Sequence, residues 1–256
     1  MGGLLKSNPV VFLILNFLLY LFYGLVIGVS VVPSVCLVVF ACQLNLFTAA
    51  ILNICIVSLG IGLGVYLFFI VGLLVFGVVE RILSVGFKPG KYKTDSAFFM
   101  RWLVYSGVHT ISLSLILPYV QGSGFVKIYY SIVGCKLGKN VFINTVGLHD
   151  AYLLELGDNV VVGGKSDLTC HIFEGDCLLL GNIKVGDNVM IGANCYIMPG
   201  VTIGDHCDIG ANSLIRKNKT IAPDTMLMPV PAMPARQVAG MINLSRKSNR
   251  KEELKL

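Results

Sequence analysis

The segment from Val185 to Leu227 reads VGDNVMIGANCYIMPGVTIGDHCDIGANSLIRKNKTIAPDTML and decides the fold. A period of six matches neither the alternation of a single strand nor the turn of a helix. It fits a solenoid of short strands with sharp corners, in which one aliphatic side chain per hexad points at the axis. Three hexads complete a coil, and successive coils stack about 4.8 Å apart. The aliphatic residues that return at every sixth position are Val185, Ile191, Ile197, Ile203, Ile209, Ile215, Ile221 and Leu227.

The hexads at 191–195 (IGANC) and 203–207 (IGDHC) resemble the repeats of left-handed parallel β-helix (hexapeptide-repeat) acyltransferases. The resemblance implies an all-β left-handed parallel β-helix over residues 128–236, with acyltransferase activity. Residues 232–236 resemble the closing Gly-x-Pro-Ala-Arg segment of that superfamily, with Ala232 in place of the glycine. Because relatives of this solenoid build active sites between subunits, the resemblance also implies a homotrimer.

The composition predicts a membrane region at residues 1–80. The chain is 55% hydrophobic and 13% charged, and the 71 residues from Pro9 to Val79 include no charged residue and no histidine. One bilayer crossing needs about 20 residues. We predict an α-helical hairpin of two transmembrane helices, at 10–32 and 54–79, with Pro33 ending the first. A third crossing between them would put the polar residues Gln43 and Asn45 near the bilayer centre, which costs free energy.

Charge predicts the orientation of the chain in the membrane. The net charge is +6, and a basic cluster at positions 81–101 follows the second predicted helix directly. Such a cluster marks the cytoplasmic side, so we expect a multi-pass cell-membrane protein whose β-helix faces the cytoplasm, with membrane lipids as partners and no nucleic acid. We predict that the basic tail at 237–256 lies on anionic headgroups, with disorder as the alternative. The cluster comprises Arg81, Lys88, Lys91, Lys93 and Arg101.

Residues 81–127 join the membrane region to the solenoid. They begin with a basic turn, Lys-Pro-Gly-Lys-Tyr at 88–92, and continue with an aromatic stretch at 98–105 and an apolar stretch at 111–120, separated by Gly107. We interpret both stretches as amphipathic helices lying in the membrane interface. The alternative is that they pack beneath the solenoid.

Two departures from the hexad rhythm lie beside histidines. From Ile143 to Leu156 the chain takes thirteen residues instead of twelve, and from Leu168 to Val185 it takes seventeen instead of eighteen. A coil that bulges there can form a cleft. Counting by coils stacks His149 near Leu168, which sets its ring roughly 10 Å from that of His171.

Acyl transfer from a thioester requires a group that takes a proton from the attacking amine or hydroxyl, and histidine titrates in the suitable range. We therefore predict His171 and His149 as catalytic residues, with Asp150 and Glu174 as orienting carboxylates. The alternative for each is a structural role. His206 occupies a regular hexad and is expected to point outward, and His109 is expected in a core or interface. Lys217 and Lys219 are candidate contacts to donor phosphates, with a solvated corner as the alternative.

A zinc site of the kind found in gamma-class carbonic anhydrases would need His149, His171 and His206 to converge. The hexad count separates them, so we predict no metal. The eight cysteines include no CxxC pair. We interpret Cys195 and Cys207, which occupy small-residue positions of the hexads, as packing residues in a reducing compartment.

A longer resemblance adds to the repeats. The two apolar spans, the basic step at 88–92, Phe-Met-Arg-Trp at 99–102, Leu-Gly-Asp at 156–158 and Thr-Cys-His-Ile-Phe at 169–173 are similar to the membrane-embedded C-terminal domain of ε-poly-lysine synthetases. The resemblance covers about Val10 to Arg236 and aligns His171 with that family's histidine. The adenylation and carrier domains of that family are not in this chain, so the resemblance implies a separate thioester donor, either coenzyme A or an acyl or aminoacyl carrier protein.

Two hypotheses follow. In the first, the protein is a membrane-bound acyltransferase or aminoacyltransferase that moves an acyl group from a thioester to an amine or hydroxyl, with a histidine as general base. In the second, it is a non-catalytic, membrane-anchored trimerising scaffold. A fold alone does not choose between them.

Overall fold

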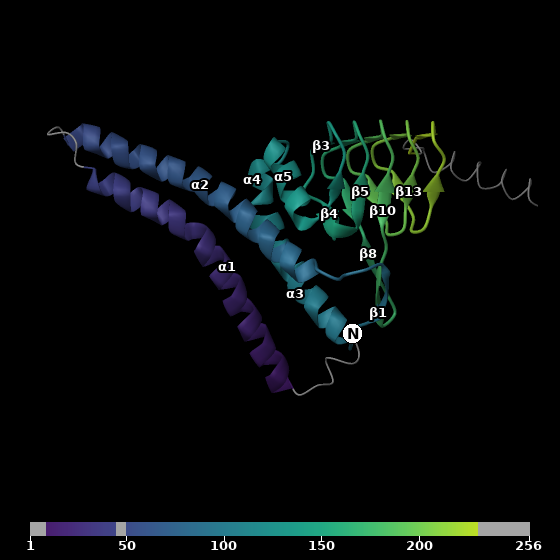
Figure 1. Ribbon diagram of the computed structural model, residues 1–256, viewed down its shortest axis with the longest axis horizontal. Helices are drawn as coiled ribbons and strands as arrows, with labels where there is room; N and C mark the ends of the chain where they lie inside the picture. The colour runs from purple at the N-terminus through teal and green to yellow at the C-terminus, as the bar shows by residue number, and fades with distance from the viewer. Residues whose placement is uncertain (1–8, 45–49, 230–256) are drawn as a thin grey trace, which may run out of the picture.

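The computed structural model describes residues 9–44 and 50–229. Figure 1 shows a long helical hairpin, a layer of shorter helices and then a coil of short strands. The predicted closing segment at 232–236 and the basic tail at 237–256 lie outside the described residues. The helices are α1 (Pro9–Gln43), α2 (Ala50–Ser84), α3 (Ala97–Leu115), α4 (Leu117–Val120) and α5 (Gly124–Val133).

The two predicted apolar helices are confirmed, although their bounds differ. Two helical segments, Phe17–Gln43 and Ala50–Ser84, are long and apolar enough to cross a membrane. The prediction that Pro33 ends the first helix is wrong, because α1 runs through it to Gln43. A proline inside a helix removes one backbone hydrogen bond and bends the axis, and α1 is bent in Figure 1.

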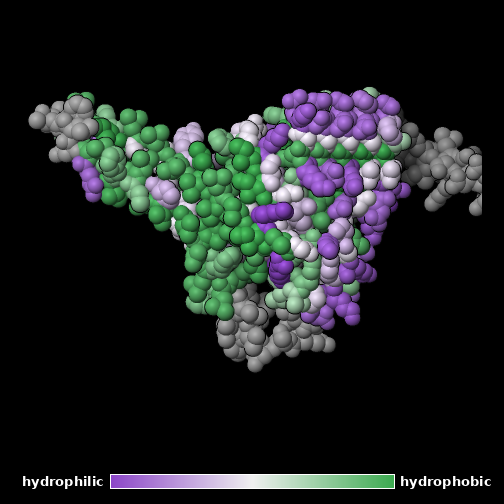
Figure 2. All heavy atoms as spheres, viewed as in Figure 1, coloured by the Kyte–Doolittle hydropathy of each residue, from purple (hydrophilic) through white to green (hydrophobic). Residues whose placement is uncertain are grey.

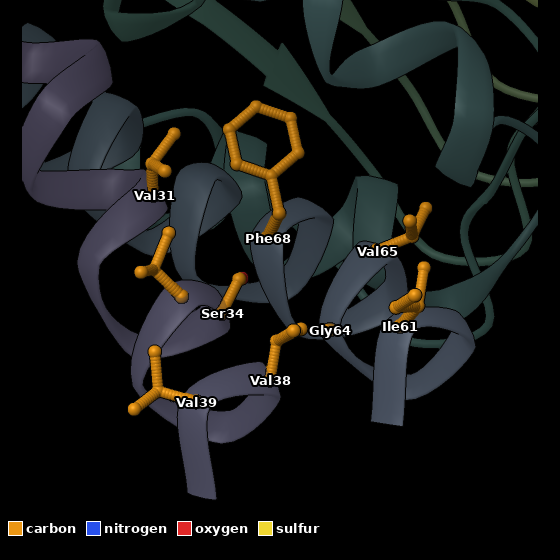
Figure 3. Close-up of a pocket in the computed structure, with 9 residues that line it drawn as sticks. Val31, Ser34, Val38, Val39, Ile61, Gly64, Val65 and Phe68 are labelled. Atoms are coloured by element: carbon orange, nitrogen blue, oxygen red, sulfur yellow. The ribbon is translucent and has the colours of Figure 1, made fainter. Parts of the chain in front are cut away.

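The hairpin presents apolar side chains outward, whereas the coil presents polar ones, as Figure 2 shows by colour. A groove of about 330 Å³ lies between α1 and α2, lined by Val31, Val38, Gly64, Val65 and Phe68 among others (Figure 3). Gly64 brings the helices close, since a Cβ there would lie 3.3 Å from a methyl group of Val38.

The two helices predicted at the membrane interface are a single helix over most of their length. Helix α3 begins at the N-cap Ser96, whose hydroxyl accepts from the Phe99 backbone N–H, and continues through Gly107 to Leu115. Gly107 does not end it, and the Tyr23 ring of α1 lies where a side chain at position 107 would stand, which requires glycine there. Its buried face packs into the same core as the coil. This favours the alternative of packing beneath the solenoid.

The coil has three sheets, and all their strand pairs are parallel. One sheet has the order β16-β13-β10-β5-β2, the second β17-β14-β11-β6-β3 and the third β15-β12-β7-β4. The predicted parallel solenoid is therefore confirmed, and its hand stays a prediction. The strands are β2 (Lys136–Leu137), β3 (Phe142–Ile143), β4 (Leu148–His149), β5 (Leu154–Leu156), β6 (Val161–Val162), β7 (Asp167–Thr169), β10 (Ile183–Val185), β11 (Met190–Ile191), β12 (Tyr196–Ile197), β13 (Thr202–Ile203), β14 (Asp208–Ile209), β15 (Leu214–Ile215), β16 (Thr220–Ile221) and β17 (Met226–Leu227).

The hexad aliphatics form the axial core, as the period of six predicts. Val185 pairs with Ile203 and Ile191 with Ile209, so each coil of eighteen residues repeats in register. The aliphatic positions are buried from Val185 to Ile215. The coils approach so closely at the corners that a Cβ on Gly192 would lie 2.5 Å from the backbone nitrogen of Ala211 in the next coil. Small residues at these positions are therefore a steric requirement of stacking.

A separate antiparallel sheet projects from the coil. It has the order β1-β9-β8, where β1 is Gly90–Lys93, β8 is His171–Glu174 and β9 is Cys177–Leu180. The basic step predicted as a turn at the headgroups thus continues into a strand that pairs with β9. This sheet ties the segment after α2 to the coil, next to the second departure from the hexad rhythm.

Candidate active site

The two departures from the rhythm have different structural causes. At the first, Asp150 adopts a left-handed backbone conformation (φ 54°, ψ 46°) and begins the 3₁₀ turn Ala151–Leu153. At the second, the β8–β9 hairpin is inserted, which widens the spacing of paired residues from the usual 18 to 29, as in Leu156 with Val185. The turn and the hairpin bring Asp150 and His171 together.

Asp150 is the centre of this site. Its side chain is 1% exposed, and it accepts hydrogen bonds from Trp102 Nε1 at 2.8 Å, Tyr152 OH at 3.0 Å and His171 Nδ1 at 2.5 Å. Burial raises the pKa of this carboxyl, but the bonds and charge of its three partners lower it more, so the pKa lies below its usual value. Asp150 is therefore a buried anion at neutral pH.

This carboxylate fixes the His171 ring. With Asp150 at Nδ1, the neutral ring carries its proton there and leaves the lone pair on Nε2. The side chain is 26% exposed. The Trp102 ring lies edge-on at a centroid distance of 5.0 Å, and Phe173 lies at 6.4 Å. Aromatic rings and one carboxylate thus hold a partly exposed imidazole in one orientation.

His149 lies next to His171, with ring centroids 6.2 Å apart. His149 lies near Leu168 as predicted, since Leu148 pairs with Leu168 and His149 with Thr169, but its ring is closer to that of His171 than the predicted separation of roughly 10 Å. Burial and the neighbouring His109 and His171 lower the pKa of His149 to about 4. The ring is therefore neutral at neutral pH.

A second carboxylate–histidine pair lies on the other side of His149, and the sequence interpretation did not identify it as a site. Glu80 Oε2 lies 3.1 Å from His109 Nδ1, and both side chains are buried. Ser112 Oγ donates to Glu80 at 3.0 Å, and Tyr129 OH also donates to it. The signal in the sequence is Glu80 itself, the first charged residue after the uncharged run. A buried charge needs partners.

The other predicted site residues lie elsewhere. Glu174, at the end of β8 in the β8–β9 hairpin, forms an ion pair with Lys217, and Lys219 is exposed. His206 is an exposed corner residue with φ 56°. Within residues 9–44 and 50–229, no group of three His, Cys, Asp or Glu side chains has a metal-holding arrangement. The structure thus brings His171, His149 and Asp150 together and leaves Glu174 and the two lysines apart from them.

The family model for the bacterial transferase hexapeptide (six repeats) matches residues 182–217. The chain carries the hexapeptide repeat of bacterial transferases. This match confirms the resemblance that the period of six implied. It covers the regular coils that follow the candidate site.

Over 115 residues, 45% of its length, the chain is 28% identical to the delta-poly-L-ornithine synthetase of Acinetobacter baumannii (strain AB307-0294). The match spans 8% of that curated relative. This likeness is in line with the predicted resemblance to poly-amino-acid synthetases.

Two solved structures are similar to part of this chain. A maltose O-acetyltransferase from Clostridium difficile 630 is 20% identical, with 60% of this chain and 93% of that chain covered and a TM-score of 0.42. A hexapeptide-repeat acetyltransferase from Vibrio cholerae is 19% identical, with 54% and 92% covered and a TM-score of 0.39. At these scores neither structure bears on the activity of this chain.

Proposed function

We propose that this protein is an acyltransferase or aminoacyltransferase that uses a thioester donor, with His171 as general base and Asp150 as its orienting carboxylate. One observation carries the proposal: the buried Asp150 carboxylate holds Nδ1 of a partly exposed imidazole. This arrangement fixes the tautomer that leaves Nε2 as the proton acceptor, and it stabilises the imidazolium that forms.

The chemistry balances at this base. The amine or hydroxyl attacks the thioester carbonyl carbon while its proton passes to His171 Nε2. The carbon–sulfur bond then breaks, and the thiol leaves with the electron pair. Positioning of donor and acceptor in one cleft contributes to the rate along with the base.

The donor is proposed to be a thioester of coenzyme A or of a carrier protein, and the acceptor an amine. The relative is named as a synthetase of poly-L-ornithine, a polymer whose amide bonds form when amines attack activated carboxyl groups. An aminoacyl donor and an amine acceptor therefore fit this chain best. Lys217 and Lys219 stay candidates for donor phosphates.

We further propose that α1 and α2 cross the membrane and that the coil is left-handed, faces the cytoplasm and forms a homotrimer. Helix α2 has 35 residues. At 1.5 Å per residue it is ~52 Å long, more than the ~30 Å hydrocarbon core. Its C-terminal end with Glu80 and Arg81 extends beyond the lipid and reaches the site, so the hairpin holds the site at the membrane surface.

The test is a transfer assay with the full chain purified in detergent. Acetyl and ornithyl thioesters of coenzyme A serve as donors and L-ornithine as acceptor, with free thiol and amide product both measured. His171→Ala is expected to lower transfer by at least about 100-fold with an unchanged unfolding temperature. The matched control His206→Ala replaces an exposed histidine of a regular coil and is expected to retain full activity. No transfer by the wild type, together with a lower unfolding temperature in His171→Ala, would favour the scaffold.

A further inference from the structure

Two carboxylate-bound histidines flank a third one that has a different environment. Asp150 binds Nδ1 of His171, and Glu80 binds Nδ1 of His109. The His149 ring lies 6.2 Å from the His171 ring and 5.4 Å from the His109 ring, nearly perpendicular to each. The three rings therefore form a row that runs from the exposed side of the site to a buried anion.

The inner pair has features that packing alone does not explain. Glu80 is 0% exposed and accepts bonds from three groups, so its side-chain oxygens are hydrogen-bonded. His109 Nε2, in contrast, is buried and has no hydrogen-bond partner within the described part of the chain. A buried ring nitrogen without a partner costs free energy and calls for an explanation. A proton exchange with the neighbouring His149 ring provides one.

We propose, on the basis of the transferase function above, that His149 is a second catalytic residue, the proton donor to the departing sulfur. In this proposal the buried Glu80–His109 pair is the positioning element that resupplies its proton. His149 is suited to contact the reactants because its side chain is 29% exposed, whereas His109 is buried.

The proton balance closes within the row. His171 takes one proton from the attacking group, and as the carbon–sulfur bond breaks, the proton of His109 passes to His149, which gives it to the sulfur. The proton held by His171 then returns through His149 to His109. The ring separations call for a single bridging water or a small ring rotation at each transfer. A neutral acceptor thus leaves the site in its starting protonation state.

The pKa values of His109 and His149 agree with proton transfer from His109 through His149 to the sulfur. Burial lowers the pKa of His109, but the Glu80 charge and hydrogen bond raise it more, so the pKa lies above its usual value, which favours the protonated ring. Burial and the other two histidines lower the pKa of His149 to about 4, so a protonated His149 gives its proton up readily.

Besides the Tyr129 and Tyr152 phenols that bond to Glu80 and Asp150, two aspartates and the Tyr105 phenol are titratable groups near the row. Asp150 raises the pKa of both His109 and His149, and Asp167, whose Oδ1 lies 3.7 Å from His149 Nε2, raises that of His149. The Tyr105 ring stacks on His109 at 6.1 Å, and burial raises the pKa of its phenol well above the usual value. These groups stay unchanged in the His149 and Glu80 variants that test this inference.

The experiment compares two leaving groups on the same acyl group. N-acetylcysteamine thioesters release an alkyl thiolate that benefits from protonation, whereas thiophenol thioesters release a more stable thiolate that departs without it. In the transfer assay above, His149→Phe is expected to lower kcat/KM about 100-fold with the alkyl thioester but less than about fivefold with the aryl thioester. His171→Ala is the matched control and is expected to lose activity with both. Equal losses with both thioesters in His149→Phe would overturn the proposal.

The role of the inner pair has a separate measurement. Glu80→Gln keeps the shape of the side chain and removes the charge that raises the pKa of His109. The alkaline limb of the kcat/KM profile with the alkyl thioester is expected to move to lower pH, and the aryl thioester profile to stay in place. A uniform fall at every pH, with a lower unfolding temperature, would show that the pair is only structural. A wild type that uses neither thioester, or a fully active His171→Ala, would refute the proposed transferase function itself, and this inference would fall with it.

Discussion

The coils from β10 to β17 and the coils from β2 to β9 share one architecture but differ in the regularity of their strand spacing. In the later coils paired residues are eighteen apart throughout, and the exposed histidine His206 has no role in the site. In the earlier coils the spacing changes to 19, 20 or 29 residues, and three histidines gather beside the changes. The regular coils form a uniform support, and the irregular ones bring the histidines and Asp150 together.

The difference extends to what covers each part. Helix α3 packs against the irregular coils and supplies Trp102 and His109, whose partners Asp150 and Glu80 are both buried. The site is therefore built from three sources: the end of the apolar hairpin, a covering helix and the interrupted coils. Each prediction below changes one residue in one region and asks whether the other region responds.

The largest effect is expected from Asp150→Asn. An amide in place of the carboxylate no longer fixes the Nδ1–H tautomer of His171, so kcat/KM for transfer is expected to fall about 1,000-fold. The matched control is Asp208→Asn, which removes an exposed carboxylate from β14 in the regular coils and is expected to have no effect. Transfer by Asp150→Asn within tenfold of the wild type would contradict the orienting role.

The second prediction reverses the comparison by damaging the regular coils. Ile197 is fully buried and pairs with Leu168 and Ile215 in the coils on either side. Ile197→Ala is expected to lower the free energy of unfolding by about 3 kcal/mol, through lost burial and the cavity that remains. Denaturant unfolding in detergent measures the loss. The kcat per folded molecule is expected to stay unchanged, and a parallel fall in kcat would show that the two regions are not separable.

The third prediction concerns the contact between the covering helix and the irregular coils. Trp102→Phe removes one of three donors to Asp150, a charge-assisted bond with a typical contribution of about 1.5–3 kcal/mol. The pKa of Asp150, now below its usual value, rises, so the carboxylate takes up a proton at a higher pH. The acid limb of the rate profile is therefore expected to move to higher pH. Transfer at neutral pH is expected to fall about tenfold, because the carboxylate that orients His171 loses one of the bonds that hold it in place. Tyr152→Phe removes the second donor and should shift the limb in the same direction; an unmoved limb in both variants would argue against this control of Asp150.

The regular region was predictable because a single local rule repeats in it. Val185, Ile191 and the aliphatic residues that follow at every sixth position predict the coil, and the structure places them at its axis. The β8–β9 hairpin was not predictable by counting hexads. It widens the spacing to 29 residues, one less than five hexads, so the insertion reads as one missing residue. In the hexad count, the inserted antiparallel hairpin is visible only as a shift of one residue.

The candidate site was partly predictable for a related reason. His171 and His149 stood out because each adjoins a break, and Asp150 because it adjoins a histidine. The partners Trp102 and Glu80 did not, since contacts across 48 and 29 residues depend on how α2 and α3 pack. Local rules predict helix ends at Pro33 and Gly107. Both residues lie inside helices: an apolar helix tolerates a proline, and glycine at position 107 leaves room for the Tyr23 ring.

The smallest effect is expected from Lys217→Ala, which cuts the one ion pair seen between the hairpin and a later coil in residues 9–44 and 50–229. Both side chains are partly exposed, so the pair contributes less than about 1 kcal/mol and weakens with salt. The unfolding temperature and kcat are expected to change little, because Glu174 lies apart from His171 and its partners. KM gives the sharper comparison. If Lys217 also binds donor phosphates, KM rises for the coenzyme A thioester but not for the N-acetylcysteamine thioester, which has no phosphate. Because Glu174 already neutralises the ammonium group, we expect KM for both donors to change by less than about twofold. A rise in KM confined to the coenzyme A thioester would instead show that Lys217 binds the donor.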